Sequence, residues 1–245
     1  MRYRLLDEIR GLTLISMILY HACWDLVYMF QVKAPWYETR GAYYWQQSIC
    51  WTFIFLSGFC WHLGRNKLKH AGKIFFAGLL VTAVTLLFMP QDRIVFGVLT
   101  FLGTAAFIVL AAEKVLNKVQ PCPGLLFFLC MFGLTKQVGS GYLGTGFFRI
   151  LKVPAAFYRN WFTTFLGFPH TGFYSTDYFP VFPWIFLYIA GYYMYRWMEQ
   201  NDLFFVFDRS ICNPAGVMGR HSLYIYLLHQ PVLYLVFSFL FNIMA

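Results

Sequence analysis

The chain has 245 residues, of which 60% are hydrophobic and only 12% are charged, and its formal net charge is +9. Soluble domains carry about 25% charged residues, so the composition excludes an ordinary soluble protein and indicates an integral membrane protein. The basic residues lie in short connections between apolar segments, which argues against a nucleic-acid partner, because orientation in the lipid bilayer already accounts for them.

Seven apolar segments approach the roughly 20 residues that a helix needs to cross a bilayer. We therefore predict an all-α, polytopic membrane helix bundle of about seven transmembrane helices, in a single domain over residues 1–245. The predicted spans are 11–30, 45–64, 73–90, 94–113, 123–135, 179–197 and 220–244.

The segment 135–177 is rich in glycine, proline and aromatic residues. It also carries the basic residues Lys136, Arg149, Lys152 and Arg159. Irregular backbone cannot face lipid, so this segment is expected to cap the bundle or to line a cavity. A further short or re-entrant helix around 143–167 is compatible with its composition.

The distribution of basic residues predicts the orientation of the chain in the cell membrane. Lys and Arg residues are more numerous on the side of the N-terminus, and the loop Arg65–Lys73 is the strongest cue. This bias predicts a cytoplasmic N-terminus and an external C-terminus. We expect the Arg65–Lys73 loop to contact anionic lipid headgroups, and His62 beside it to be solvated.

Three polar residues lie on one face of the first predicted helix. His21 follows Arg10 by three helical turns, or roughly 16 Å, and Asp25 lies one turn beyond His21. Residues four apart on a helix share a face, so His21 and Asp25 can touch. Ionisable residues at membrane depth are functional-site hypotheses, and a carboxylate beside an imidazole leaves the other ring nitrogen free to act as a base.

Other interpretations of these residues stay open at this point. The pair His21–Asp25 can serve catalysis, a structural hydrogen bond between helices, or ligation of haem or a metal. No cluster of Cys and His residues has metal-binding spacing, so no metal site is expected. Arg10 is placed to pair with a phosphate group or with Asp7.

Polar residues in the later segments are further candidates. The last predicted span carries Arg220, His221, His229 and Gln230, which can meet the first helix inside the bundle, either as substrate contacts or as hydrogen-bonding residues between helices. Asp177 stands at the head of the sixth span, where a carboxylate favours a helix N-terminus. Acceptor binding on the external side is the alternative for Asp177.

Several short motifs occur in a fixed order along nearly the whole chain. They are Asp7–Leu12 followed by His21, Phe55–Gly58, Phe96–Leu99, Asp177–Trp184, Gly219–Leu223 and His229–Pro231. Together they resemble the heparan-alpha-glucosaminide N-acetyltransferase catalytic-domain family, in its bacterial members. The spacing of Arg10 and His21 is also similar to that of the broader transmembrane acyltransferases that modify extracytoplasmic sugars.

The resemblance implies an acyltransferase that moves an acyl group, expected to be acetyl, from acyl-CoA to a hydroxyl or amine of a sugar-like or lipid-linked acceptor. Acetyl-CoA is then a co-substrate, and no permanently bound cofactor is implied. By the resemblance His21 is the general base and Arg10 helps to hold the donor. From its position one turn beyond His21, Asp25 is expected to orient the imidazole. The candidates for acceptor contact or for support of the site are Asp177, Arg220, His221, His229 and Gln230.

Two functions of other classes are kept beside the acyltransferase. In a proton-coupled transporter or other membrane binding protein, His21–Asp25 would act as a proton relay, although we find no internal repeat of the kind common in transporters. In an electron carrier, His21 and His229 would be axial haem ligands. The glycine- and aromatic-rich surfaces permit a homodimer.

Overall fold

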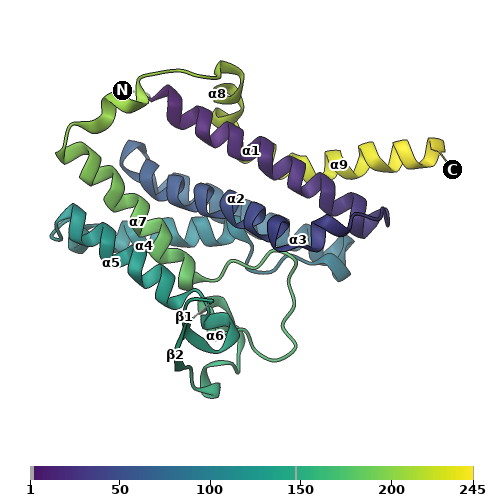
Figure 1. Cartoon of the computed structure of the whole chain (residues 1–245), viewed down its shortest axis with the longest axis horizontal. Helices are drawn as coiled ribbons and strands as arrows, with labels where there is room; N and C mark the ends of the chain where they lie inside the picture. The colour runs from purple at the N-terminus through teal and green to yellow at the C-terminus, as the bar shows by residue number, and fades with distance from the viewer. Residues whose placement is uncertain (1–2, 147, 245) are drawn as a thin grey trace. The chain divides into compact units, whose positions relative to one another are not determined.

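The computed structural model describes residues 3–146 and 148–244, and it is built of helices with one small hairpin (Figure 1). The described residues form nine α-helices and two short strands, which confirms the predicted all-α class in its main features. The chain divides into two compact units. The first comprises Met1–Phe53 and Asp202–Ala245, and the second comprises Ile54–Asn201. The single domain over residues 1–245 stays a prediction.

Five helical segments in the described chain are long and apolar enough to cross a membrane, so the protein is a multi-pass membrane protein. They are Arg4–Met29, Lys67–Phe88, Val98–Leu116, Pro121–Ser140 and Ser222–Asn242. Five of the seven predicted spans thus meet this criterion of length and apolar composition. The remaining two predicted spans are helical, but they are more polar, because helix α2 carries Arg40, Gln46 and Gln47 and helix α7 is rich in tyrosine.

The first unit is built around helix α1 (Arg4–Trp24), which continues as a π-helical turn over Asp25–Met29. A short 3-10 helix (Pro35–Glu38) leads into α2 (Arg40–Phe59), whose first part belongs to this unit. The chain returns through another 3-10 helix (Leu203–Phe207) to α8 (Asn213–Arg220) and α9 (Ser222–Met244).

Helices α1 and α8 pack at backbone distance through glycines. A Cβ atom on Gly11 would lie 1.8 Å from the carbonyl oxygen of Ala215, and one on Gly219 would lie 1.9 Å from that of Asp7. No side chain larger than hydrogen fits at either position without moving a helix. Small residues of this kind allow the close helix packing that is common in membrane proteins.

Apolar side chains complete the first unit beside this contact. Leu14, Met17 and Ile49 form a buried cluster between α1 and α2. The indole Nε1 of Trp45 donates a hydrogen bond of 2.8 Å to the Ser16 hydroxyl and links the same two helices. These contacts hold the middle of α1, so the polar residues at its two ends are presented by a fixed helix.

The second unit contains the end of α2, a 3-10 turn (Cys60–Leu63) and the helices α3 (Lys67–Phe88), α4 (Val98–Leu116), α5 (Pro121–Thr135) and α7 (Val181–Gln200). A 3-10 turn at Pro90–Asp92 joins α3 to α4. Glycines again permit close packing, since a Cβ on Gly58 would lie 1.8 Å from the Tyr188 carbonyl oxygen, and one on Gly124 would lie 2.7 Å from the Tyr193 ring.

The segment between α5 and α7 forms a cap of irregular structure. It contains an antiparallel hairpin of β1 (Tyr142–Gly144) and β2 (Arg149–Lys152), flanked by 3-10 turns at Val138–Ser140 and Ala155–Phe157. The expected short helix is present as α6 (Trp161–Leu166), which a capping box of Asn160 and Thr163 begins. The hairpin itself was not expected from the sequence.

The contact between α1 and α8 yields a stability prediction. We expect Gly11→Ala to lower the free energy of unfolding by about 1–3 kcal/mol, because the new methyl group collides with helix backbone rather than with a flexible side chain. Thermal unfolding of the purified protein in detergent measures the change. The control is Gly133→Ala on α5, where no atom lies within 4 Å of the new Cβ. Equal loss in both variants would contradict the prediction.

Candidate active site

Four of the predicted site residues meet inside the first unit, where the end of α1 faces α9. The rings of His21 and His229 are in edge contact, with centroids 4.9 Å apart and planes at 60°. The Gln230 side-chain amide donates a hydrogen bond of 2.5 Å to Oδ1 of Asp25. The cluster therefore joins residues about two hundred positions apart in the chain, and we refer to these four residues as the imidazole cluster.

The carboxylate of Asp25 pairs with α9 rather than with its neighbour on α1. The expected hydrogen bond between Asp25 and His21 is not made within the described chain, and the ring of His21 lies against His229 instead. The reason is that α9 brings the Gln230 amide within reach of the carboxylate. Asp25 is also the first residue of the π-helical turn, and such turns are frequent at functional sites.

The tautomer of His229 follows from its partner. Its Nδ1 lies 2.5 Å from the carbonyl oxygen of Tyr226, and a carbonyl oxygen can only accept a hydrogen bond. Nδ1 therefore carries the hydrogen, and in the neutral ring Nε2 carries the lone pair. His229 thus has the arrangement of a base: one nitrogen is anchored and the other is able to take a proton.

Three polar atoms of the imidazole cluster have no hydrogen-bond partner in the described part of the protein. They are Oδ2 of Asp25, Nε2 of His229 and Oε1 of Gln230, and all three atoms are buried. The side chain of Asp25 is fully buried, and that of His229 is 9% exposed. Because buried polar groups are normally satisfied, the three unused acceptor atoms make this cluster complementary to hydrogen-bond donors such as a hydroxyl or an amine.

The other predicted basic site residues, Arg10, Arg220 and His221, lie toward the N-terminal end of α1. Arg10 is partly buried and its guanidinium lies 3.9 Å from the Asp7 carboxylate, the pairing that was one of its two predicted interactions. Arg220 and His221 are exposed at the junction of α8 and α9. Both residues follow Gly219, which packs on the backbone of Asp7. Arg220 and Arg10 therefore lie toward the same end of α1. The structure does not bring them into the imidazole cluster.

A buried carboxylate that sequence reasoning missed fixes the chain beside Arg10. Glu8 is 2% exposed and accepts hydrogen bonds from the Ser210 hydroxyl (2.5 Å) and from the backbone N–H groups of Ile211 (2.7 Å) and Cys212 (3.0 Å). Three donors satisfy the buried charge and hold the segment that leads into α8. The sequence held one signal for this role, because Glu8 lies on a different face of the first helix from Arg10, His21 and Asp25.

Asp177 belongs to the second unit and caps a helix there. Its Oδ2 accepts a hydrogen bond of 3.0 Å from the Val98 N–H at the start of α4, so it caps α4 and not the helix that follows it in sequence. The Ser175 hydroxyl supports this corner by donating to the Asp177 carbonyl and accepting from the Val95 N–H. Burial raises the pKa of the Asp177 carboxyl group to about 6, against a partial lowering by the Val98 N–H.

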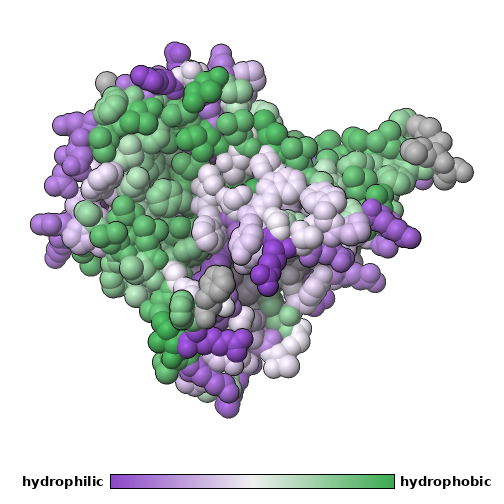
Figure 2. Space-filling view, in the orientation of Figure 1, coloured by the Kyte–Doolittle hydropathy of each residue, from purple (hydrophilic) through white to green (hydrophobic). Residues whose placement is uncertain are grey.

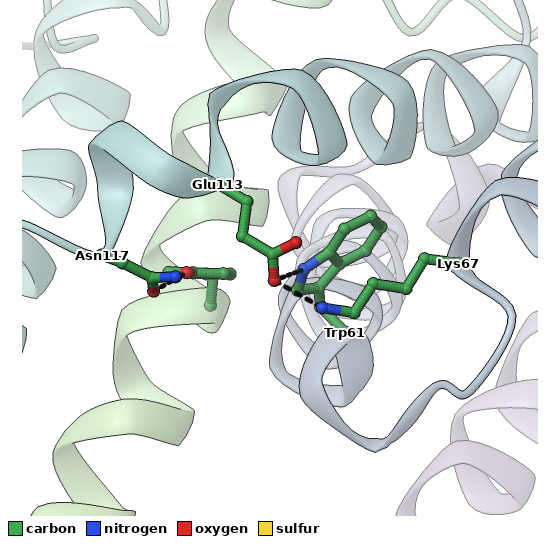
Figure 3. A network of polar contacts seen from close by, with 5 residues as sticks. Trp61, Lys67, Glu113 and Asn117 are labelled. Atoms are coloured by element: carbon green, nitrogen blue, oxygen red, sulfur yellow. Dashed lines mark hydrogen bonds and ion pairs between the residues drawn. The ribbon is translucent and has the colours of Figure 1, made fainter.

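A second polar cluster surrounds Glu113 in the second unit (Figure 3). Glu113 forms an ion pair with Lys67 and accepts a hydrogen bond of 3.2 Å from the Trp61 indole. Lys67 belongs to the basic loop that was expected to contact lipid headgroups, and it has a protein partner instead. His62 is not solvated as predicted, because its ring stacks on Tyr195 with centroids 4.7 Å apart.

A protein-family model described as heparan-alpha-glucosaminide N-acetyltransferase, catalytic, matches residues 2–231. No curated protein and no solved structure matched the chain. The matched residues include all four members of the imidazole cluster and Glu8.

Glu8 yields a prediction with a matched control next to it. We expect Glu8→Gln to lower the free energy of unfolding by about 1.5–3 kcal/mol, since hydrogen bonds to a buried charge are lost or weakened. Asp7→Asn removes the neighbouring charge from a partly exposed ion pair of 3.9 Å and should cost no more than about 0.5 kcal/mol. Unfolding of both variants in detergent measures the difference. Equal losses of stability would show that the three hydrogen bonds to Glu8 do not stabilise the fold.

Asp177 yields a prediction about pH. Its pKa in the folded protein, about 6, lies above its ordinary value of 3.8, so folding favours the protonated carboxyl group. The stability supplied by this group is therefore complete below about pH 4, falls as the pH rises to about 6, and stays constant above that. Thermal unfolding at a series of pH values tests this, and Asp177→Asn should flatten the profile between those limits. An unchanged profile in the variant would refute the assignment.

Proposed function

Because the chain belongs to the heparan-alpha-glucosaminide N-acetyltransferase catalytic-domain family, we propose that it is a membrane-embedded acyltransferase that transfers an acetyl group from acetyl-CoA to a hydroxyl or amine. The observation that carries the proposal is the buried imidazole cluster between α1 and α9, with its three unused acceptor atoms. The match to the family supports the class of reaction, and the cluster supports the position of the chemistry within the chain.

We assign His21 the role of general base. Its imidazole takes the proton of the acceptor hydroxyl or amine while that group attacks the thioester carbonyl carbon of acetyl-CoA. The new ester or amide bond forms as the carbon–sulfur bond breaks, and the proton on the imidazolium passes to the leaving thiolate of CoA. The reaction balances without a metal or a redox cofactor, and direct transfer needs no covalent acyl intermediate.

The other members of the cluster position the acceptor in this scheme. Nε2 of His229 and Oδ2 of Asp25 are acceptor atoms, so each is suited to orient a donor O–H or N–H group of the substrate. The Gln230 amide holds Asp25 in place through the hydrogen bond of 2.5 Å. Asp25 is therefore proposed to orient the acceptor and the cluster, and its predicted hydrogen bond to His21 is replaced by the contact with α9.

The donor is proposed to bind at the end of α1 that carries Arg10. CoA bears several phosphate groups, and guanidinium groups bind phosphate well. Arg220 and His221 are exposed at the same end and add positive charge or hydrogen-bond donors. This arrangement agrees with the predicted cytoplasmic N-terminus and external C-terminus, because acetyl-CoA is a cytosolic donor. The acceptor is proposed to be carbohydrate-type or lipid-linked, and Asp177 keeps its role of capping α4 in the second unit.

A proton relay is the second function that a specific observation favours. Two candidate membrane spans supply buried ionisable groups in contact, which is also how proton-coupled transporters build their pathways. The haem hypothesis is disfavoured, because the two rings contact one another directly and leave no space for an iron between them. The homodimer stays a prediction.

The general-base role yields a functional prediction. We expect His21→Ala to reduce acetyl transfer from acetyl-CoA by about 100-fold or more, because general-base catalysis contributes at least that factor. The measurement is release of CoA thiol by the purified protein in the presence of a panel of amino sugars and membrane lipids.

The matched control is His70→Ala, since His70 is an exposed histidine on α3 outside the first unit. Both variants should keep the unfolding temperature of the unaltered protein. Transfer at the normal rate in His21→Ala would overturn the assignment. Proton-coupled uptake into proteoliposomes without CoA release would instead favour the relay.

A further inference from the structure

The irregular cap of the second unit carries an open apolar pocket that the proposed chemistry does not use. Its volume is about 290 Å³, and it lies where the end of α5, the β-hairpin and the first turn of α7 meet. Apart from Thr135 and Lys152, the lining side chains are apolar, among them Leu143, Leu151, Phe157 and Phe186. The pocket and all its lining residues lie within one compact unit.

The hairpin that forms one wall of the pocket exposes large apolar side chains. Phe148, Ile150 and Leu151 are 73%, 69% and 61% exposed. Leu151 faces Leu143 across the strands, and both residues line the pocket, whereas Ile150 does not line it. A two-stranded hairpin with such a surface is marginal in water, so its apolar side chains are suited to the headgroup level of a bilayer, where water still reaches the hairpin backbone.

Positive charge accompanies these apolar residues without any negative charge nearby in the sequence. No Asp or Glu occurs from Lys114 to Thr176, a stretch that contains six basic residues. On the hairpin itself Arg149 and Lys152 are exposed, and Lys152 also lines the pocket. Figure 2 shows strongly hydrophilic and strongly hydrophobic residues next to one another over this part of the chain.

The apolar lining and the basic residues together indicate which kind of ligand fits the pocket. An apolar cavity with a lysine in its lining fits a molecule that has a hydrocarbon part and an anionic head. Its volume is at the lower end of the range of about 300–1,000 Å³ for ligand pockets, which suits one chain and not two. Basic residues at a membrane surface attract anionic phospholipids, and the arginine guanidinium binds phosphate oxygens.

We propose that this pocket binds one hydrocarbon chain of an anionic phospholipid of the bilayer, whose phosphate group contacts Lys152. Arg149, stacked on the Tyr142 ring at 4.5 Å, adds positive charge beside the phosphate. The bound lipid anchors the cap of the second unit to the membrane. This inference rests on the pocket alone and does not depend on the acyltransferase assignment.

The test measures lipid binding to the purified full-length chain in non-ionic detergent by native mass spectrometry. The probes are phosphatidylglycerol, the single-chain lysophosphatidylglycerol, and diacylglycerol, which has no phosphate. We expect both phosphate lipids to bind and diacylglycerol to bind at least about tenfold more weakly, because it lacks the charge that the basic residues attract. Equal binding of diacylglycerol would overturn the phosphate contact. Displacement of both phosphate lipids by inorganic phosphate would assign the site to a free anion and overturn the proposal.

Matched variants locate the site. Leu151→Asp places a charge in the lining and should weaken binding by about tenfold or more, while Ile150→Asp makes the same change on the neighbouring residue outside the lining and should alter it by less than about twofold. Lys152→Ala should weaken binding, and Lys118→Ala, an exposed lysine of the same acid-free stretch, should not. These positions are exposed, so unfolding temperatures should be unchanged. Equal losses within either pair would mean non-specific adsorption and would refute the proposal.

Discussion

The close approach of α1 and α8 is the constraint on which the first unit depends. Gly11 and Gly219 let the two backbones touch, and Glu8 fixes the segment that enters α8 through three hydrogen bonds. Helix α9 begins two residues after α8 ends, so this contact also determines where α9 starts beside α1. The meeting of His21 with His229 is therefore a consequence of packing that takes place at the opposite end of α1.

Two buried carboxylates on the same helix differ in how they are satisfied. Glu8 accepts three hydrogen bonds, which satisfy its buried charge and attach the segment that leads into α8 to α1. Asp25 accepts one hydrogen bond, from Gln230, and keeps a second oxygen without a partner in the described chain. The unsatisfied oxygen beside two imidazoles costs free energy, which supports the proposal that a polar acceptor group binds there.

The sequence predicted the parts of this arrangement that local periodicity controls. The stripe of Arg10, His21 and Asp25 follows from helical spacing, and the apolar runs located the helices to within several residues. It did not predict the partners of those residues, because Gln230 and Ser210 lie some two hundred positions away and spacing within one helix says nothing about them. Helices α2 and α7 were also predicted as spans, but their polar and tyrosine-rich sequences leave them less apolar than the five candidate spans. The hairpin was missed because short strands leave only a weak signal.

The hydrogen bond from His229 Nδ1 to the Tyr226 carbonyl ties the imidazole to the backbone of its own helix. The ring cannot turn to follow His21 without breaking that bond, so it travels with α9 as a rigid attachment. The separation of the two imidazoles therefore reports the separation of the two helices. In the proposed acyltransferase, any movement of α9 against α1 would therefore change the distance between His229 and the general base His21.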